Sequence, residues 1–254
     1  MSSNKKITLI LPSYNEIHSI GSTILEAVGY FESHRLLYEI IVSADGNDGT
    51  REFVKGLSAQ NPNIQVIGHI QRRGKGSGIR EAVEIAQGTF IGFADADNKT
   101  PITELDKVIP FLEQGIDMVI GSRAERQSII ERQQPWFRRI GSRGFAVLMH
   151  SVVGLWDIQD TQCGFKFFQG EIARNLFAYQ KIDGYMYDVE ILYLARLLHY
   201  QIYQVPVRWR DDGDSRLQLV RGNIRNIVDI FRLRFNARRQ LGNAIQKQYS
   251  DEHR

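Results

Sequence analysis

The chain has 254 residues, of which 43% are apolar and 24% charged, as in soluble globular proteins with one large or two small domains. A net charge of +3 is too small to indicate a nucleic-acid-binding protein. The single cysteine, Cys163, excludes an internal disulfide framework and a cysteine-based zinc site, and is typical of a reducing, cytosolic compartment.

No segment has the pattern of a membrane span. The N-terminal apolar run is interrupted at Pro12, which leaves it too short for a signal peptide. The longest charge-free apolar stretch, Gly144 to Trp156, is shorter than the roughly 20 residues of a transmembrane helix. We therefore expect a cytoplasmic protein whose membrane contact, if any, is peripheral.

Strand and helix patterns alternate through the first half of the chain. Apolar runs predict strands at residues 6–11, 38–43, 64–70, 89–95 and 117–122. Helical spacing predicts a helix between each pair of strands; the third stops at Gly88 and the fourth is capped by Thr103. This alternation predicts an α/β fold, a mostly parallel sheet with helices on both faces.

The second half is less regular. Its patterns predict a helix from Pro135 to about Val153, a strand at 164–168, a helix at 188–199 and a strand at 203–210, where Pro206 favours a sheet edge. From Leu217 a helical stripe carries Val220, Ile224, Ile227, Val228, Phe231 and Phe235, with arginines at other positions. We expect a catalytic domain over residues 1–215 and a basic amphipathic C-terminal helix and tail over residues 216–254.

The stretch FADADNKTP, from Phe93 to Pro101, places two aspartates directly after an apolar run. If the strand ends there, Asp95 and Asp97 lie at the carboxyl edge of the sheet, where open α/β sheets bind ligands. Two carboxylates so close can hold a hard cation. The alternative is a turn in which Asp97 caps the next helix.

Polar residues also follow the other predicted strands, in PSYNE from Pro12, ADGNDGT from Ala44 and RRGKGSG from Arg72. Each segment alone could be a turn, but together they predict one cleft at the shared edge. The spacing fits neither a Walker A loop nor a dinucleotide-binding fingerprint. It also does not fit a calcium loop, because Lys99 and Thr100 stand where that loop needs an oxygen ligand and a glycine.

The ordered set PSYNE, ADGNDGT, RGKG, DADN, IGSR and DTQCGFK resembles the family 2 glycosyltransferases of the GT-A, Rossmann-like fold. Within them the chain is most similar to the polyprenyl-phosphate hexosyltransferases. DTQCGFKFF, YDVEILYLA and VRWRDDGDSRL resemble the dolichyl-phosphate β-glucosyltransferase branch. The resemblance covers roughly residues 6–236.

The resemblance implies roles for particular residues. Asp95 and Asp97 would hold Mg²⁺ or Mn²⁺, and Asp97, Asp160 and Arg123 would be the catalytic residues. The acceptor phosphate would contact Arg123, Arg138 and Ser142. The nucleotide sugar would contact Pro12, Tyr14, Asn15, Glu16, Asp45, Arg73, Lys75, Asp95, Ala96, Asp97 and Arg216. The chain departs from the family pattern at Ala44, where an acid is usual, and at Lys99, which replaces a frequent metal-shell residue.

The resemblance implies an inverting, metal-dependent transfer of a hexose, with UDP-glucose the favoured donor, to a polyprenyl phosphate such as dolichyl or undecaprenyl phosphate. The alternatives are GDP-mannose or a UDP-N-acetylhexosamine as donor, a soluble or polysaccharide acceptor, and a non-catalytic nucleotide-sugar-binding protein. The Asp95–Asp97 pair favours an enzyme. Asp188 and Glu190 are interpreted as ordinary helix-start acids outside the site.

Overall fold

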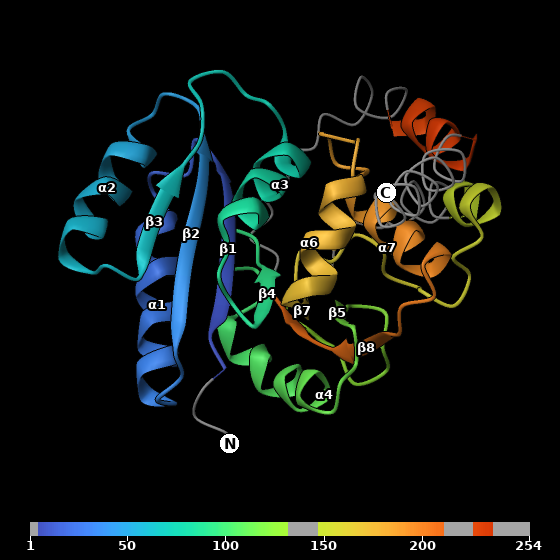
Figure 1. The fold of residues 1–254 in the computed structure, drawn as a ribbon, viewed down its shortest axis with the longest axis horizontal. Coiled ribbons are helices and arrows are strands. Elements are labelled where there is room, and N and C mark those ends of the chain that lie inside the picture. The colour runs from blue at the N-terminus through green and yellow to red at the C-terminus, as the bar shows by residue number, and fades with distance from the viewer. Residues whose placement is uncertain (1–4, 132–146, 211–225, 236–254) are drawn as a thin grey trace, which may run out of the picture.

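The computed structural model describes residues 5–131, 147–210 and 226–235. A seven-stranded sheet forms the centre of the molecule (Figure 1). In spatial order its strands are β3 (Ile64–Ile67), β2 (Tyr38–Asp45), β1 (Ile7–Tyr14), β4 (Phe90–Phe93), β7 (Lys166–Gln169), β5 (Met118–Ser122) and β8 (Ile202–Pro206). All neighbours pair in parallel except β7, which is antiparallel to both β4 and β5. The expected α/β fold with a mostly parallel sheet is confirmed.

Helices cover both faces of this sheet, as expected. They are α1 (Ile20–Ser33), α2 (Thr50–Gln60), α3 (Lys75–Ile85), the 3₁₀ helix η1 (Ile102–Lys107), α4 (Ile109–Glu113), α6 (Gly170–Tyr179) and α7 (Tyr187–Leu197). Residues 147–153 and 226–235 are also helical. A small separate sheet pairs β6 (Ile129–Ile130) with β9 (Arg208–Trp209). Among the described helices, none has the length and apolarity that crossing a bilayer requires.

Two hydrophobic cores lie on opposite faces of the sheet. Leu9 and Leu11 of β1 join the core that packs on α1, η1 and α4, whereas Ile10 joins the core that packs on α3, α6 and α7. This split follows from the two-residue repeat of a strand, which sends successive side chains to opposite faces. All eight residues of β2 are buried, as expected for a parallel strand covered on both faces.

Several predicted boundaries are wrong. The third strand ends at Ile67 because Gly68 turns the chain with a φ of 133°. A Cβ at Gly68 would lie 2.1 Å from the Ala44 carbonyl oxygen, so only glycine fits this turn. The third helix ends at Ile85, not Gly88. Thr103 is not a cap, because the 3₁₀ helix begins at Ile102 and its N-cap residue is Pro101.

Other differences lie in the second half. The predicted strand 203–210 divides into β8 and β9, and the prediction missed α6 and the short β6. Pro206 lies on the edge strand β8, as expected. Residues 147–153 and 226–235 confirm parts of two predicted helices. The remainder of both helices and the expected domain boundary at residues 215 and 216 lie outside the described residues, so that division stays a prediction.

Candidate functional site

Polar side chains converge at the carboxyl edge of the sheet, the upper edge in Figure 1. β1 ends in Tyr14, β2 ends in Asp45, and Asp95 comes two residues after the end of β4. These three strands are parallel neighbours, so their ends meet at one edge. These polar strand ends therefore share one edge of the sheet, as the sequence indicated, and the cleft between them stays a prediction.

Asp95 and Asp97 are each paired with a lysine. The Lys75 Nζ, at the start of α3, donates to Asp95 Oδ1 at 2.5 Å, and the Lys99 Nζ lies 3.0 Å from Asp97 Oδ2. Burial opposes charge on Lys75, but Asp95 and the other nearby carboxylates outweigh it and raise the pKa of Lys75. Burial and then the Asp95 charge raise the pKa of Asp97. The site thus concentrates two carboxylates and two ammonium groups beside the sheet edge.

The turn that carries the aspartates is fixed by its neighbours. The Thr23 hydroxyl of α1 donates to the Ala96 carbonyl at 2.8 Å. On the other side Gly164 packs so close to Asp95 that a Cβ there would lie 2.1 Å from Asp95 Oδ2. Asp97 accepts the Lys99 backbone N–H, at 3.3 Å, and does not cap a helix. The helix-cap alternative is therefore wrong.

The two carboxylates supply the oxygen ligands that a hard divalent cation takes. Within the described parts of the chain, no three or more His, Cys, Asp or Glu side chains are grouped to hold a metal. A cation at Asp95 and Asp97 would take its other ligands from phosphate oxygens and water, an arrangement that suits Mg²⁺. A cation would also relieve the repulsion from Asp95 that helps to raise the Asp97 pKa.

Asp45 organises the loop after β3. Its carboxylate accepts the backbone N–H groups of His69, at 3.1 Å, and of Arg73, at 2.7 Å. An open pocket of about 520 Å³ lies beside it, lined by Arg51, Gly68, His69, Ile70, Gln71 and Arg73. Ala44, where the family usually has an acid, is buried, and the Arg51 guanidinium donates to its carbonyl oxygen.

The last residues of β1 and the residues that follow it lie at the same edge. Pro12 pairs in register with Ser43, and the Arg72 guanidinium lies 4.3 Å from the centre of the Tyr14 ring. Asn15 has a positive φ of 55°, and its side-chain oxygen accepts the Asn47 backbone N–H at 3.3 Å. The backbone N–H of Glu16 donates to the Thr50 hydroxyl at 3.1 Å, which ties this segment to the start of α2.

Arg123 and Asp160 form a bidentate ion pair. Asp160 accepts from the Arg123 Nε at 2.7 Å, from Nη2 at 2.8 Å and from its backbone N–H at 2.8 Å. Burial opposes ionisation of Asp160, but Arg123 outweighs it and lowers the pKa of that carboxyl. Asp160 is therefore an ionised group that orients Arg123. The other predicted residues, Arg138, Ser142 and Arg216, lie outside the described residues.

Two acids that the sequence interpretation set aside are not ordinary helix-start residues. Asp188 and Glu190 of α7 are both buried. Asp188 pairs with the fully buried Lys166 at 2.6 Å. Glu190 accepts the backbone N–H groups of Lys181 and Ile182. The signal that could have identified them is the apolar character of YDVEILYLA on every side, which predicts a buried helix and hence buried acids.

Known proteins resemble this chain in sequence and in fold. The model of the glycosyl transferase family 2 domain matches residues 8–176. The dolichyl-phosphate β-glucosyltransferase of Drosophila melanogaster is 33% identical over 226 residues, which are 84% of this chain and 69% of the relative. That of Homo sapiens is 31% identical over 236 residues, which are 85% and 71% of the two chains.

Solved structures share the fold at lower identity. Glucosyl-3-phosphoglycerate synthase from Mycobacterium tuberculosis, in complex with Mn²⁺, UDP and phosphoglyceric acid, has a TM-score of 0.67 and is 21% identical. The match covers 91% of this chain and 78% of that one. Mannosyl-3-phosphoglycerate synthase from Rubrobacter xylanophilus has a TM-score of 0.66, is 19% identical, and matches over 94% and 75%. With the family match over most of the described sheet, the chain belongs to glycosyl transferase family 2 and is a glycosyltransferase of the GT-A fold.

Proposed function

We propose that the protein transfers a hexose from a nucleotide sugar, with UDP-glucose the favoured donor, to a polyprenyl phosphate, with inversion at C1. The observation that carries this proposal is that two groups of charged residues share one edge of the sheet. Asp95 and Asp97 follow the end of β4, and Arg123, which binds Asp160, follows the end of β5. About 30% identity to dolichyl-phosphate β-glucosyltransferases over most of both chains supports the donor and acceptor class.

The chemistry needs charge stabilisation at the leaving group. As the bond from C1 to the donor diphosphate breaks, negative charge grows on the departing diphosphate. Mg²⁺ or Mn²⁺ held by Asp95 and Asp97 would supply Lewis-acid stabilisation of that charge. Lys75 and Arg73 stand at the start of α3 and in the loop before it, where they can donate charge-assisted hydrogen bonds to phosphate oxygens.

On the acceptor side, the reaction needs a correctly oriented phosphate more than it needs a general base. A lipid phosphate oxygen is already anionic, so it can attack C1 from the face opposite the leaving group without losing a proton. Asp160 fits this requirement because its lowered pKa keeps it ionised and bound to Arg123. A guanidinium has five N–H donors, so Arg123 can hold Asp160 and still bind a phosphate. Arg138 and Ser142 complete the proposed acceptor-phosphate site.

A donor and acceptor panel tests the proposal. The purified protein is incubated with UDP-glucose, GDP-mannose or UDP-N-acetylglucosamine, and with a short polyprenyl phosphate or 3-phosphoglycerate, in Mn²⁺ or EDTA. Mass spectrometry should show one dominant product, the glucosylated lipid phosphate, which disappears in EDTA and returns with Mg²⁺ or Mn²⁺. Full activity in EDTA, or faster transfer to 3-phosphoglycerate, would refute the proposal.

A variant pair tests the metal-binding role of Asp97. Asp97→Asn removes one of the two carboxylate charges, and we expect kcat to fall about 100-fold or more, since electrostatic stabilisation of this kind is worth several kcal/mol. Asp106→Asn is the control, because Asp106 is exposed and contacts Tyr30 on another part of the molecule. Equal kcat values for the two variants would exclude the assigned role.

A further inference from the structure

A fully buried ion pair lies beneath the proposed metal site. The Lys166 side chain, on β7, is 0% exposed, and the Asp188 side chain, on α7, is 6% exposed. The Lys166 Nζ lies 2.6 Å from Asp188 Oδ1 and 5.7 Å from the centre of the Phe93 ring. Phe93 is the last residue of β4, two residues before Asp95. The pair therefore lies on the same side of the sheet as α7, beside the last residue of the strand that leads into the aspartate turn.

A gain in folding stability alone does not explain why a buried ion pair occupies this position. Removing two charges from water costs several kcal/mol per ion, and apolar residues of similar volume are often equally stable. A buried lysine and aspartate are thus better explained by what their charges hold in place.

The contacts of Lys166 point to the loop between Asp160 and Gly164. The Lys166 Nζ also donates to the Cys163 carbonyl oxygen at 2.6 Å. One end of the loop carries Asp160, which binds Arg123 through three hydrogen bonds. The other end is Gly164, which abuts the carboxylate of Asp95. A shift of the Cys163 backbone would therefore disturb both ends.

The start of α7 also lies beside the lysine that contacts Asp95. The Lys75 Nζ is 5.8 Å from the centre of the ring of Tyr187, the residue before Asp188. Lys75 itself donates to Asp95 Oδ1 at 2.5 Å. The start of α7 thus lies close to both ammonium groups, that of Lys75 at Asp95 and that of Lys166 at Cys163.

We propose that Lys166 and Asp188 are positioning residues that hold the Asp160–Gly164 loop against Asp95, so that metal and nucleotide bind with the correct geometry. The inference rests on the proposed function for its reaction. Its central measurement, the binding of Mn²⁺ and UDP, does not depend on the acceptor.

The test is the double variant Lys166→Met with Asp188→Asn, which removes both charges and keeps both volumes. We expect its affinity for UDP in the presence of Mn²⁺, measured by calorimetry, to fall about 10- to 100-fold, the usual effect of losing a group that orients metal ligands. We expect kcat to fall as well, with the acceptor KM changed less than threefold. Affinity and kcat both within threefold of wild type would overturn the proposal.

Two further variants separate positioning from stability. Lys6→Met breaks the 3.0 Å pair with the buried Glu39 at the opposite end of the sheet strands. It should lower the Tm without changing UDP affinity. Gly164→Ala leaves Lys166 intact but places a Cβ against Asp95, and it should reproduce the affinity loss even if the double variant fails to fold. Wild-type affinity in Gly164→Ala would show that the loop does not hold Asp95.

These outcomes are distinct from failure of the proposed function. Wild-type protein that binds UDP and Mn²⁺ but transfers no sugar to the lipid phosphate would refute the acceptor assignment. Unchanged UDP affinity in the double variant would refute the positioning role, whatever the acceptor is.

Discussion

At the scale of single residues, the sequence indicates the exposed charges of the site better than the buried ones. Asp95 and Asp97 were predictable because a charge directly after an apolar run marks a strand end. Asp188 and Glu190 were missed because acids are common in the first turn of a helix, where they face solvent and the helix dipole. What distinguishes them is their burial, which depends on how α7 packs and not on its first turn alone.

Glu190 leads to a prediction about pH. Burial raises the pKa of Glu190 to about 7, although Lys181, Ile182 and Arg80 favour its ionised form. A carboxyl with a raised pKa binds more protons in the folded state than in the unfolded state between pH 4.5 and 7. The contribution of Glu190 to the free energy of unfolding is therefore fully present below pH 4.5 and is lost as the pH rises through about 7.

Glu190→Gln should remove this dependence. Denaturant unfolding at several pH values should show that the wild type loses stability relative to the variant between pH 4.5 and 7, by at most about 3 kcal/mol. Parallel stability curves over that range would show that Glu190 is ionised throughout.

At the scale of elements, the glycines before and within α3 have a packing role that the sequence did not reveal. The sequence interpretation of the RGKG segment concerned only the contacts of Arg73 and Lys75 with the nucleotide sugar. In the fold, a Cβ at Gly76 would lie 2.4 Å from the Ile182 carbonyl oxygen and 2.6 Å from the Tyr187 Cβ. The Gly76 backbone N–H also donates to the Asp183 carbonyl at 2.9 Å. The start of α3, and with it Lys75, is thus fixed against the segment before α7, a contact between residues about 100 positions apart.

Gly76→Ala should therefore displace this contact and destabilise the protein by about 1–3 kcal/mol. Gly56→Ala in α2 is the matched control, because a Cβ there meets no atom within 4 Å. That variant should stabilise the protein by about 0.5–1 kcal/mol, since alanine favours the helix. Chemical denaturation of both variants checks the expected opposite signs. The same sign for both would mean that the α3 contact can relax.

At the scale of the whole molecule, periodicity predicted the layers but not the strand order. Alternating strands and helices imply a sheet covered on both faces, and the two cores confirm this. No local feature of the sequence predicts that β7 is antiparallel, because a short apolar strand has the same residue pattern whether it pairs in parallel or antiparallel. Its position between β4 and β5 depends on pairings with strands far away in the sequence.

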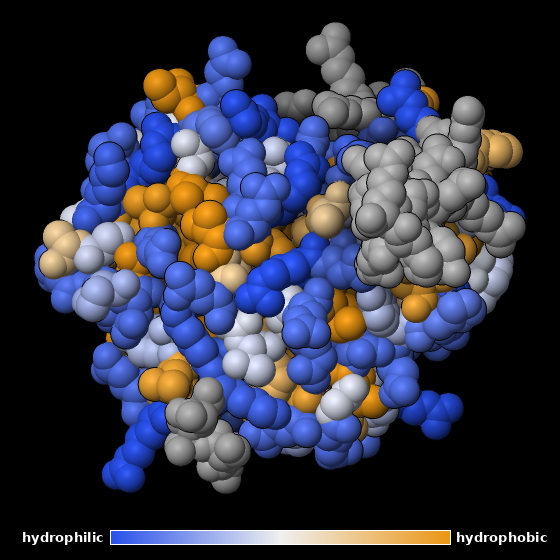
Figure 2. Space-filling model, in the orientation of Figure 1, coloured by the Kyte–Doolittle hydropathy of each residue, from blue (hydrophilic) through white to orange (hydrophobic). Residues whose placement is uncertain are grey.

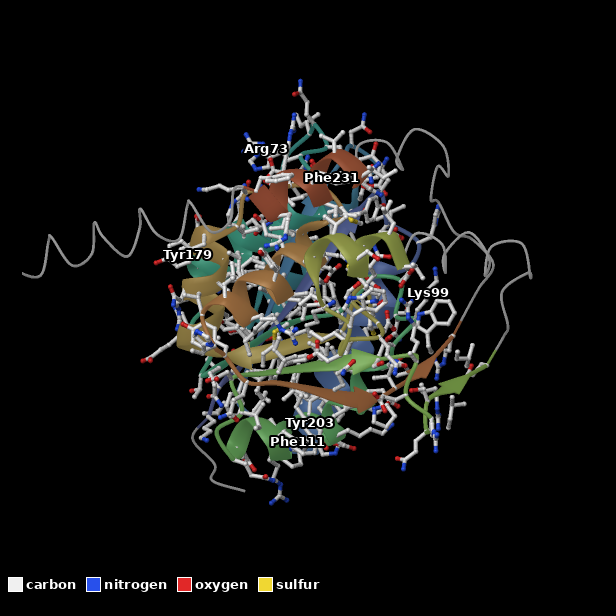
Figure 3. The ribbon with its side chains drawn as sticks, turned by 90° about the vertical axis from the view of Figure 1, so that its right-hand side faces the viewer. Arg73, Lys99, Phe111, Tyr179, Tyr203 and Phe231 are labelled. Carbon is white, nitrogen blue, oxygen red and sulfur yellow. The ribbon has the colours of Figure 1, made fainter. Side chains whose placement is uncertain are left out.

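The molecular surface bears on how the enzyme would meet the proposed lipid acceptor. The face in Figure 2 is mostly hydrophilic, with an apolar area over β2 and β3. Elsewhere, residues 226–235 pack inward through Ile230 and Leu233 and leave Val228, Phe231 and Phe235 exposed. Figure 3 shows Phe231 near the top of the molecule. Of the predicted apolar stripe, Val228, Phe231 and Phe235 are exposed and Ile227 is partly buried, whereas the inward-packing Ile230 and Leu233 are not part of it.

We expect these three exposed apolar residues to enter the membrane interface, with neighbouring arginines such as Arg232 contacting anionic headgroups. The protein should float with anionic vesicles at low salt, and less at high salt, because each basic residue near the surface adds about 1 kcal/mol that salt screens. Phe231→Ser with Phe235→Ser should weaken flotation, whereas Leu25→Ser should not, since Leu25 is a 67% exposed apolar residue of α1. If the Phe231→Ser/Phe235→Ser variant floats as well as the wild type, the helix does not dock on the membrane. If the wild type fails to float yet glucosylates short soluble acceptors, docking requires a partner protein.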